Sequence, residues 1–311
     1  TNTSVLDVKM NDTTIYELFS STKPLGITPE QIGGCQLATF GIPEFGTRFL
    51  QQVLMDAKPK NFADLLQISG LTHGTGVWLG NADELIKQGI CDISKVIGCR
   101  DNIMNDLIRY GVENALSFKI MESVRKGKGL TPEWEAAMRE HDVPEWYIDS
   151  CKKIAYLFPK AHAAAYVMSA IRLGWYKVHM PAAFYAGFFT AAPGGFDAEI
   201  VAGGYAGVNA TIAELEAKGN EASAKENETC ATLYLVREAL ARGVTFMNVS
   251  LEKSDAKAFL PENGKIRMPF NSLSGLGDTA AQKIIEARDK YDLYSVEELR
   301  LKTGVTKSVI E

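Results

Sequence analysis

The sequence predicts a mainly α-helical protein with a small β element late in the chain. From Arg48 to Leu66, and again in patterns that reach Phe158, apolar residues recur every three or four positions, as they do in amphipathic helices. In contrast, "KAFLPENGKIRMPF" sets Asn263-Gly264 between two alternating stretches, which indicates a β-hairpin. With 311 residues, the chain is long enough for one large domain or two to three smaller ones.

Composition narrows the classes of function. The formal net charge is -5, so any binding of nucleic acid must rest on local basic patches. The five cysteines are scattered and never spaced as CxxC, so we expect free thiols in a reducing cytoplasm rather than a zinc site or disulfides. No apolar run approaches the roughly 18 residues of a membrane span, and no signal-peptide pattern is present. Because the first residue is Thr rather than Met, we expect a piece of a longer protein.

Helical patterns account for most of the first half. "MNDTTIYELFSS" predicts an Asp-capped helix from about Thr13 to Phe19. The tripeptide Lys58-Pro59-Lys60 predicts a break between two helices, and "SGLTHGTGVWLG" predicts a flexible Gly-rich loop. Further helices are expected at residues 81–89, 101–110, 113–126 and 131–140, and over "VPEWYIDSCKKIAYLF" as far as Phe158.

The character of the sequence changes near Ala192, where we place a boundary between subdomains. Residues 192–227 begin with the Gly-rich "APGGFDAEIVAGGYAGVNA", and acidic, strongly helical residues follow. Strand patterns run from Val244 to Phe270. "FNSLSGLGDTAAQKIIEARDKY" then places Gly275-Leu276-Gly277 before a clear helix.

The stretch "CKKIAYLFPKAHAAAYVMSAIRLGWYKVH" combines Lys, Arg and two His with no acidic residue. Pro159 suits the first position of a helix, which puts Lys160 and His162 in the first turn beside exposed N–H groups. These groups, the helix dipole and a cation make a site for a phosphate-like anion. Tyr166 lies four residues beyond His162, on the same face. A nucleoside triphosphate fits this pattern; a core helix with an incidental Lys and a satisfied His is the alternative.

Two further basic positions are candidates for phosphate contacts. "FKIMESVRKGKGLTPEW" puts Arg125, Lys126 and Lys128 on a turn interrupted by glycines, which suits phosphate clamping. A solvated loop is the alternative interpretation of this turn. Arg100, at a predicted helix start, could fork onto a phosphate or could pair with a nearby aspartate.

Two glycine-containing segments complete the candidates. Ser69, His73 and Trp78 lie in the predicted loop and could shape a pocket wall, although a surface turn explains them as well. In "LSGLGDTAAQKIIEAR", two helices joined by Gly-Leu-Gly would present backbone N–H groups to a DNA phosphate, with Lys283 on the following helix. The sequence shows no paired acids with metal-like spacing, nucleophile elbow, Walker loop or HExxH motif. It resembles the positive half of a nucleotide site without the carboxylates that hold Mg²⁺.

Together these stretches resemble the alpha subunit of bacterial replicative DNA polymerase III of the PolC type, found in low-GC Gram-positive bacteria. They cover nearly the whole chain in the family's order, and the part from about residue 192 to 255 is more divergent. The segments that carry the resemblance are "SSTKPLGITPEQI", "GIPEFGTRF", "ISGLTHGTGVWLGNADELI", "VIGCRDNIM", "FKIMESVRKGKGLTPE", "HDVPEWYIDSCKKIAYLFPKAHAAAYV" and "SLSGLGDTAAQKI".

The resemblance implies a multi-helix polymerase fingers domain, followed by a small β-hairpin element and a helix-hairpin-helix module. It assigns residues 1–30 to the palm-to-fingers connection and residues 31–191 to the nucleotide-binding fingers. Residues 192–243 would form a helical subdomain of the fingers. Residues 244–311 would form a duplex-binding region that stops before the family's C-terminal clamp-binding motif.

The activity that the resemblance implies is template-directed transfer of a deoxynucleotide to a primer 3′ end. The partners would be primer–template DNA and dNTPs, with the sliding clamp and other replisome proteins bound largely through parts outside this chain. Two Mg²⁺ ions would be held by palm aspartates, and these acids, the histidinol-phosphatase-like domain and the proofreading exonuclease have no counterpart here. We therefore expect no catalytic residue and no bound metal in this chain, no membrane partner, and a cytoplasmic location.

Carried onto this sequence, the resemblance gives each candidate residue a role. Contacts to the incoming dNTP are expected from Arg100, Arg125, Lys126, Lys128, Lys160, His162 and Tyr166. The pocket would be shaped by Ser69, His73 and Trp78, and duplex DNA would be held by Gly275, Leu276, Gly277 and Lys283.

Two other hypotheses remain open. The chain could be a non-catalytic DNA-binding module that uses the Gly-Leu-Gly hairpin, with the helix after Pro159 purely structural. It could also be a scaffold within the replication machinery, which only the acidic helix at residues 211–241 supports. As an isolated polypeptide, the chain is expected to bind its ligands without polymerising.

Overall fold

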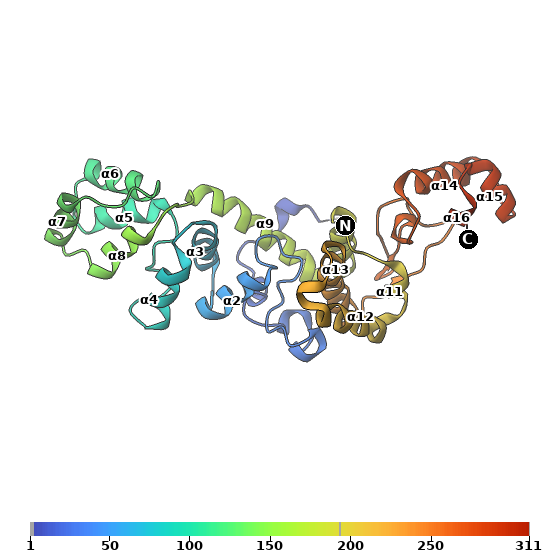
Figure 1. Ribbon diagram of the computed structural model, residues 1–311, viewed down its shortest axis with the longest axis horizontal. Coiled ribbons are helices and arrows are strands. Elements are labelled where there is room, and N and C mark those ends of the chain that lie inside the picture. Colours follow the sequence, from blue (N-terminus) through green and yellow to red (C-terminus); the bar gives the residue numbers. More distant parts are fainter. Residues whose placement is uncertain (1–2, 193, 311) are drawn as a thin grey trace. The chain divides into compact units, whose positions relative to one another are not determined.

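Helices dominate the structure, as the sequence predicts. The computed structural model describes residues 3–192 and 194–310 (Figure 1). The chain divides into two compact units. The N-terminal unit consists of Val5–Pro24 and Leu37–Gly174, and the C-terminal unit consists of the residues up to Ser4, Leu25–Gln36 and the chain from Trp175 onward. Within the described part, no helix is both long enough and apolar enough to cross a bilayer.

The N-terminal unit contains most of the short helices. In chain order, its elements are η1 (Val5–Asp7), α1 (Thr13–Glu17), α2 (Arg48–Ala57), α3 (Phe62–His73), the π-helical turn η4 (Trp78–Ala82), α4 (Asp83–Lys87), α5 (Arg100–Arg109), α6 (Asn114–Val124), α7 (Pro132–Glu140), α8 (Glu145–Lys153) and the larger part of α9 (Lys160–His179). The turn η2 (Lys23–Leu25) leads from this unit into the other. Figure 1 shows α5 to α8 gathered in one group.

Local sequence signals explain several of the helix boundaries. The Asp12 carboxylate accepts a hydrogen bond from the Thr14 N–H at 3.0 Å and caps α1, which ends two residues before the expected Phe19. Between α2 and α3, Lys58 adopts a left-handed conformation with φ of 49°. Asn61 then caps α3 by accepting from the Asp64 N–H at 3.1 Å. The predicted break between these two helices is confirmed.

A close approach between α1 and α9 fixes part of the N-terminal core. A Cβ on Gly174 of α9 would lie 3.0 Å from Ile15 of α1 and 3.1 Å from Leu18, which follows α1. Both of those side chains are completely buried. Phe19 packs edge-on against Phe45, with ring centroids 5.1 Å apart. The glycine therefore lets α9 lie directly against the apolar residues of α1.

The stretch "SGLTHGTGVWLG" is not the flexible loop that we expected. Ser69 to His73 form the last turns of α3, and Trp78 begins η4. Helix α3 tolerates Gly70 because this residue packs against Gly98: a Cβ at Gly70 would lie 2.2 Å from the Gly98 carbonyl oxygen. Tight packing, rather than chain flexibility, explains this glycine.

The helix expected to run to Phe158 ends earlier, at Lys153 of α8. Residues 154–159 are extended because Tyr156 pairs with Thr75 in an isolated β-bridge. The Thr75 N–H donates to the Tyr156 carbonyl at 3.0 Å, and the Tyr156 N–H donates back at 3.2 Å. A contact distant in sequence therefore overrides the local helical pattern.

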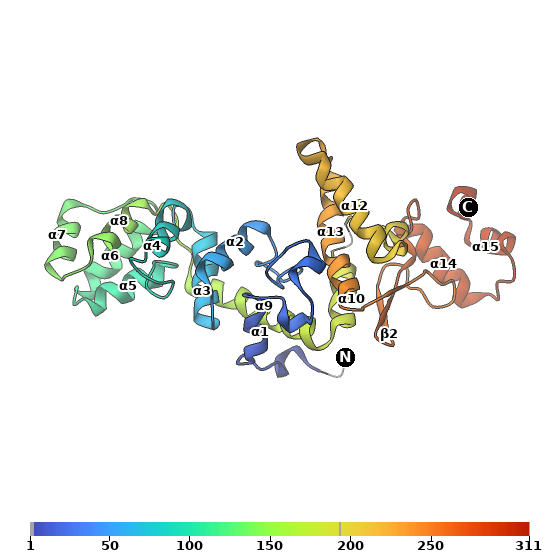
Figure 2. The same cartoon turned by 90° about the horizontal axis from the view of Figure 1, so that it is seen from below.

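The C-terminal unit combines longer helices with a small sheet. Its elements are η3 (Pro29–Ile32), the end of α9, α10 (Pro181–Ala191), α11 (Ala198–Ala202), α12 (Gly204–Lys218), η5 (Gly219–Glu221), α13 (Ala224–Ala241), β1 (Phe246–Met247), β2 (Leu260–Glu262), β3 (Lys265–Arg267), η6 (Phe270–Ser272), α14 (Asp278–Lys290), α15 (Val296–Thr303) and α16 (Lys307–Ile310). Figures 1 and 2 both show α12 and α13 side by side, and the two helices contact each other along their lengths.

A buried ionic network joins three helices of this unit. Lys177 of α9 and Glu238 of α13 are both fully buried, and their Nζ and Oε1 atoms lie 2.7 Å apart. The Tyr185 hydroxyl of α10 donates to the same Oε1 at 2.8 Å. Arg242 donates to the Tyr185 hydroxyl at 3.1 Å and to the Lys177 carbonyl at 2.7 Å. Burial lowers the pKa of Lys177, while Glu238 opposes this effect.

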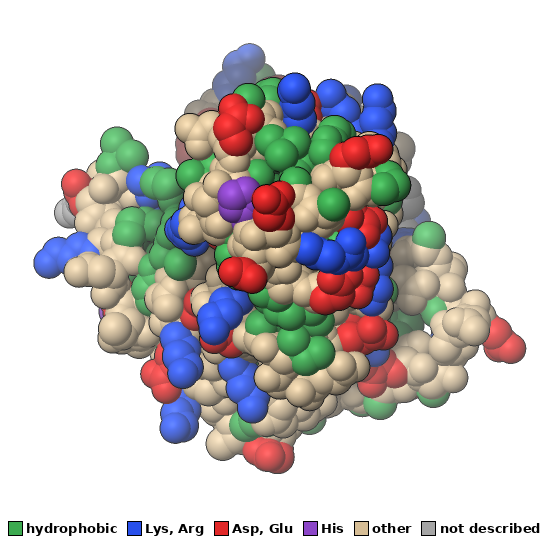
Figure 3. All heavy atoms as spheres, turned by 90° about the vertical axis from the view of Figure 1, so that its left-hand side faces the viewer, with side chains coloured by type: hydrophobic (Ala, Val, Ile, Leu, Met, Phe, Trp, Pro, Cys, Tyr) green, Lys and Arg blue, Asp and Glu red, His purple; other side chains and the backbone are tan. Residues whose placement is uncertain are grey.

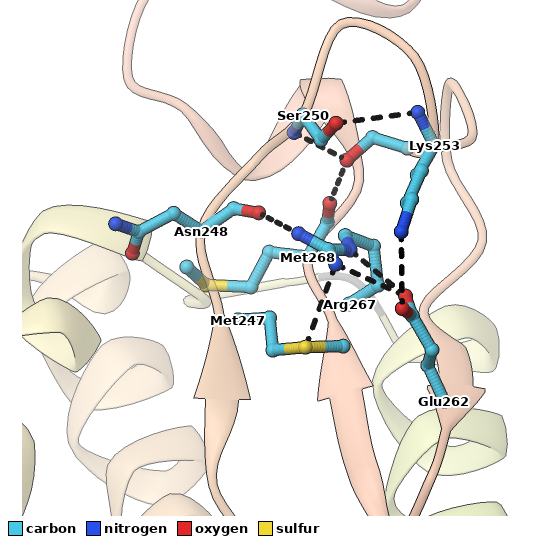
Figure 4. A network of polar contacts seen from close by, with 8 residues as sticks. Met247, Asn248, Ser250, Lys253, Glu262, Arg267 and Met268 are labelled. Atoms are coloured by element: carbon cyan, nitrogen blue, oxygen red, sulfur yellow. Dashed lines mark hydrogen bonds and ion pairs between the residues drawn. The ribbon is translucent and has the colours of Figure 1, made fainter.

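The predicted hairpin is confirmed and forms part of a three-stranded sheet in the order β1-β3-β2. Strands β2 and β3 pair antiparallel, and Asn263 and Gly264 between them have φ of 53° and 78°, as a tight two-residue hairpin turn requires. Strand β1 pairs with β3 in parallel. Figure 4 shows Arg267 of β3 clamping this sheet: its guanidinium donates to Glu262 at 3.0 Å and to the Asn248 carbonyl at 2.9 Å.

The predicted helix after Gly275-Leu276-Gly277 is confirmed as α14. The element before it differs from the expected helix, because only the single 3₁₀ turn η6 precedes the glycines. Leu276 instead anchors a small apolar core. The other buried members of this core are Ala256, Phe270, Ala281 and Ile284.

Candidate functional site

A row of aromatic rings passes from the extended segment after α8 into the start of α9. In extended backbone, residues two apart point to the same side. Tyr156 is accordingly exposed and Phe158 half-buried on one side, whereas Leu157 between them is buried. Their ring centroids lie 6.2 Å apart. The β-bridge to Thr75 therefore sets the direction of two aromatic side chains, not just the backbone path.

Helical spacing continues the row along α9. Phe158, His162 and Tyr166 follow one another at intervals of four residues, so their side chains lie on one face. The ring centroids of Phe158 and His162 are 4.6 Å apart, and those of His162 and Tyr166 are also 4.6 Å apart. Tyr156 and Tyr166, at the two ends, are 44% and 43% exposed. We call these four residues the aromatic row.

His73 supports the aromatic row from α3. Its ring centroid lies 5.4 Å from that of Phe158. Its Nδ1 lies 2.7 Å from the carbonyl oxygen of Ser69, and its Nε2 lies 2.5 Å from a carboxylate oxygen of Glu44. Because both neighbours are oxygen acceptors, both ring nitrogens are used within the protein. The structure thus brings His73 to the start of α9, with Ser69 contributing its backbone carbonyl while its side chain is buried.

Lys160 and Arg100 both lie where the row enters α9. The Arg100 N–H donates to the Phe158 carbonyl at 3.2 Å. The side chain of Lys160 is exposed and that of Arg100 is half-buried, and neither makes an ion pair with any residue that the structure describes. The Lys160 N–H is not open to solvent as expected, because the Asp101 carboxylate accepts from it at 2.9 Å. At the start of α9, two cations that make no ion pair with a described residue therefore lie near one carboxylate, that of Asp101.

The basic turn after α6 lies against the same extended segment. The Leu157 N–H donates to the carbonyl of Arg125 at 3.3 Å. Gly127 has φ of 69°, and a Cβ there would lie 2.5 Å from the Ala155 carbonyl oxygen, so the turn and the segment are in close contact. Lys128 on this turn is exposed.

The carboxylate of Glu122 pairs with two of the three cations on this turn. Glu122 binds the Arg125 guanidinium, with Nη2 at 2.8 Å, and also lies 2.9 Å from the Lys126 ammonium. Hydrogen bonds from these two side chains lower the pKa of Glu122 to about 2. Of the three cations predicted on the turn, only Lys128 makes no ion pair within the described residues.

Most other cations between residues 151 and 179 pair with acidic side chains outside the aromatic row. Lys152 pairs with Asp149 at 3.0 Å, Lys153 lies 3.6 Å from Glu84, and Lys177 belongs to the buried network. Figure 3 shows acidic and basic side chains intermixed over the face that carries α6 to α8. Positive charge near the aromatic row thus depends on a few side chains, mainly Lys160, Arg100 and Lys128.

Two residues near the site are buried. Trp78 is 5% exposed and packs in the interior, so it does not lie on a flexible loop as we expected. Ala163, which follows His162 in α9, is 1% exposed and faces the core.

The Gly-Leu-Gly hairpin of the C-terminal unit forms a separate candidate site. Gly275 has φ of 82°, and space is open around both Gly275 and Gly277. No described protein group accepts from the N–H of either glycine. Leu276 differs, because its side chain is 8% exposed and its N–H donates to the Leu273 carbonyl at 3.2 Å. Lys283 is exposed on α14.

An acid with its own partners opens α14. Asp278 follows Gly277 directly, and its carboxylate lies 2.6 Å from the Lys257 ammonium. The Asn271 amide donates to the same carboxylate at 3.0 Å. These hydrogen bonds, that from Lys257 first, lower the pKa of Asp278. The hairpin therefore has an ion pair, Lys257 with Asp278, beside the N–H groups of Gly275 and Gly277.

Sequence reasoning missed Tyr156, Phe158 and Glu44. A signal existed for the two aromatic residues: their spacing of two, followed by two spacings of four, matches an extended segment that enters a helix. No local signal identified Glu44, which lies 29 residues from its partner His73. Across the described residues, no group of three or more His, Cys, Asp or Glu side chains could hold a metal ion.

Comparison with known proteins adds independent information. Residues 1–142 match the family described as the bacterial DNA polymerase III alpha subunit finger domain, and residues 243–311 match the helix-hairpin-helix motif. The chain is 49% identical over 304 residues to "DNA polymerase III PolC-type" of Bacillus subtilis, and equally similar to that of Halalkalibacterium halodurans. The protein of the same name from Lacticaseibacillus paracasei is 47% identical over 306 residues. Each match covers 98% of this chain but only 21% of the relative.

Proposed function

We propose that the chain is the nucleotide-selecting and duplex-holding part of a PolC-type replicative polymerase. The proposal starts from two matches: residues 1–142 match the finger domain of bacterial DNA polymerase III alpha subunits, and residues 243–311 match the helix-hairpin-helix motif. The reaction of the whole protein would be transfer of a deoxynucleotide to a primer 3′ end. In the proposed division, residues 31–191 form the fingers, residues 192–243 their helical subdomain, and residues 244–311 the duplex-binding region.

The observation that carries the proposal is the convergence of Lys160, Arg100 and the aromatic row at the start of α9. A triphosphate carries several negative charges, and a helix start with nearby cations favours such an anion. In this arrangement, Lys160 and Arg100 contact the phosphates, with Lys128, Arg125 and Lys126 as further contacts. The ring of Tyr166 then lies beside the base or sugar.

The Gly-Leu-Gly hairpin supports the second half of the proposal. The open N–H groups of Gly275 and Gly277 can donate to a phosphate of the DNA backbone without obstruction by a side chain. Leu276 takes part as the apolar anchor that holds the turn, and Lys283 supplies positive charge. These contacts read no base, so they suit a protein that must hold duplexes of any sequence.

The chemistry proposed for the whole protein requires divalent metal ions, for which we propose Mg²⁺. The described residues do not offer a set of ligands for such ions, so no catalytic step is assigned to this chain. Its own residues bind and orient the nucleotide. Contacts with a sliding clamp and a cytoplasmic location also belong to the proposal for the whole protein.

Photo-crosslinking with an azido-dATP analogue tests the nucleotide site. We expect labelling to map to the peptide that contains His162 and Tyr166. Lys160→Ala should reduce labelling by about tenfold, which corresponds to roughly 1.4 kcal/mol. Lys119→Ala is the matched control, because Lys119 is an exposed lysine of α6 that makes no ion pair with a described residue.

Labelling that is absent, or equal in the two variants, would contradict the nucleotide site. If such a chain still bound duplex DNA, the alternative of a non-catalytic helix-hairpin-helix module would be favoured. A primer-extension assay complements this test: we expect no synthesis by the chain alone, and robust synthesis would overturn that expectation.

A further inference from the structure

The aromatic row extends beyond the residues needed for a single nucleotide. His162 and Tyr166 suffice for the proposed dNTP contact. The half-buried Phe158 and the exposed Tyr156 continue the row in the opposite direction, toward the basic turn after α6. A second ligand of related chemistry can therefore contact this end of the row.

We propose that Tyr156 and Phe158 form a stacking site for an unpaired base of single-stranded DNA. Proteins that bind single strands commonly combine exposed aromatic faces, on which bases stack, with cations that follow the backbone. The inference rests on the proposed function only for its choice of DNA. The aromatic and charged groups themselves are independent of that function.

Hydrogen bonds fix the backbone that carries these two rings. Two hydrogen bonds to Thr75 fix Tyr156, and the Arg100 N–H fixes the carbonyl of Phe158. Leu157, between them, is 1% exposed and anchors the segment in the core. On the inner side, His73 packs against Phe158. Because these contacts already fix the backbone of the segment, stacking a base on the rings requires no ordering of the chain.

Charge complementarity also favours a nucleic-acid strand. At the Tyr156 end, the turn with Lys126 and Lys128 contacts the extended segment through Gly127 and Ala155. Lys160 and Arg100 lie next to Phe158. A strand that stacks its bases on Tyr156 and Phe158 would thus have cations near its phosphates beside each ring.

Fluorescence anisotropy with a labelled oligothymidylate of about twelve nucleotides tests the proposal. Tyr156→Leu and Phe158→Leu should each weaken binding about 5- to 10-fold, within the range for loss of a base–aromatic stack. Tyr156→Phe should retain affinity, because it keeps the ring. Phe118→Leu is the matched control, since Phe118 is a 50% exposed aromatic residue of α6 outside the row.

Two further probes make the result specific. An abasic oligonucleotide of the same length should bind all variants equally weakly, because it lacks bases to stack. Circular dichroism of each variant checks that the fold is intact. Equal affinity of Tyr156→Leu, Phe118→Leu and the unmodified chain for oligothymidylate would overturn the stacking site. The site would also be overturned if Tyr156→Leu weakened binding of the abasic strand as much as binding of oligothymidylate. Row-dependent binding of oligouridylate as tight as that of oligothymidylate would overturn the choice of DNA.

The test separates this inference from the proposed function. If Tyr156→Leu left strand binding unchanged while azido-dATP still labelled the peptide of His162, only the stacking site would fail. If strand binding depended on Tyr156 but no nucleotide were captured, the stacking site would stand and the nucleotide site would fail.

Discussion

Two lysines on one helix illustrate opposite uses of the same residue type. Lys160, at the start of α9, has an exposed side chain and makes no ion pair within the described part of the chain. Lys177, near the end of α9, is fully buried and bound to Glu238. The lysines of α9 therefore serve two separate purposes. At one end a cation is available to a ligand, and at the other it is part of the fold.

Removing the buried cation should have the largest effect. Lys177→Met leaves Glu238 buried without its counter-ion, and loss of one partner of a buried ion pair costs about 3–5 kcal/mol of unfolding free energy. Chemical denaturation measures this loss. Lys160→Met is the comparison and should change the unfolding free energy by less than about 0.5 kcal/mol, because its side chain is exposed. Similar losses for the two variants would remove the distinction.

The variant Lys177→Met/Glu238→Met sharpens the same comparison. Removing both charges avoids an uncompensated buried carboxylate, so part of the lost stability should return. No recovery relative to Lys177→Met alone would indicate that packing, rather than charge, dominates this end of α9.

A smaller effect is expected where the basic turn contacts the extended segment that carries Tyr156 and Phe158. Gly127→Ala places a methyl group 2.5 Å from the Ala155 carbonyl at a φ of 69°, which should cost about 1–3 kcal/mol and shift the extended segment. Both strand binding and nucleotide capture should fall. Gly129→Ala is a matched control: its φ is 70°, but the space around it is open. An equal loss for Gly129→Ala would show that backbone strain alone, and not contact with Ala155, determines the effect.

The smallest effect concerns Glu122. Its pKa is lowered from 4.5 to about 2 in the folded chain, so its contribution to stability is present above pH 4.5 and is lost as pH falls toward 2. Glu122→Gln should flatten this acid dependence of unfolding. It should also strengthen binding of oligothymidylate two- to threefold at low salt, because Arg125 and Lys126 lose their carboxylate. Glu140→Gln, at an exposed end of α7, should change neither measurement.

Local physics made several features predictable. The Asp12 cap, the break at Lys58 and the Asn263-Gly264 turn depend on neighbouring residues, and all three are present in the structure. The features that escaped prediction depend on distant contacts. Residues 154–158 left their helical pattern because Thr75 pairs with Tyr156.

In the candidate site, too, local spacing was predictive and contacts between distant residues were not. Spacing alone placed His162 and Tyr166 on one face of a helix, and their ring contact agrees with that prediction. Spacing could not show that Asp101 binds the Lys160 N–H, since the two residues lie on different helices. Nor could it show that Lys177 is buried, because burial depends on α10 and α13 packing around it.

The hydrogen bonds of His73 restrict its chemistry. With Nδ1 bound to a carbonyl and Nε2 to the carboxylate of Glu44, neither nitrogen is available to attack a reagent or to exchange a proton with a substrate. The face of its imidazole ring remains available for packing against a neighbouring residue. Imidazole acylation by diethyl pyrocarbonate should therefore proceed at the exposed His162 while His73 resists it, so the two histidines of one site act as a reactive and an inert member of a pair.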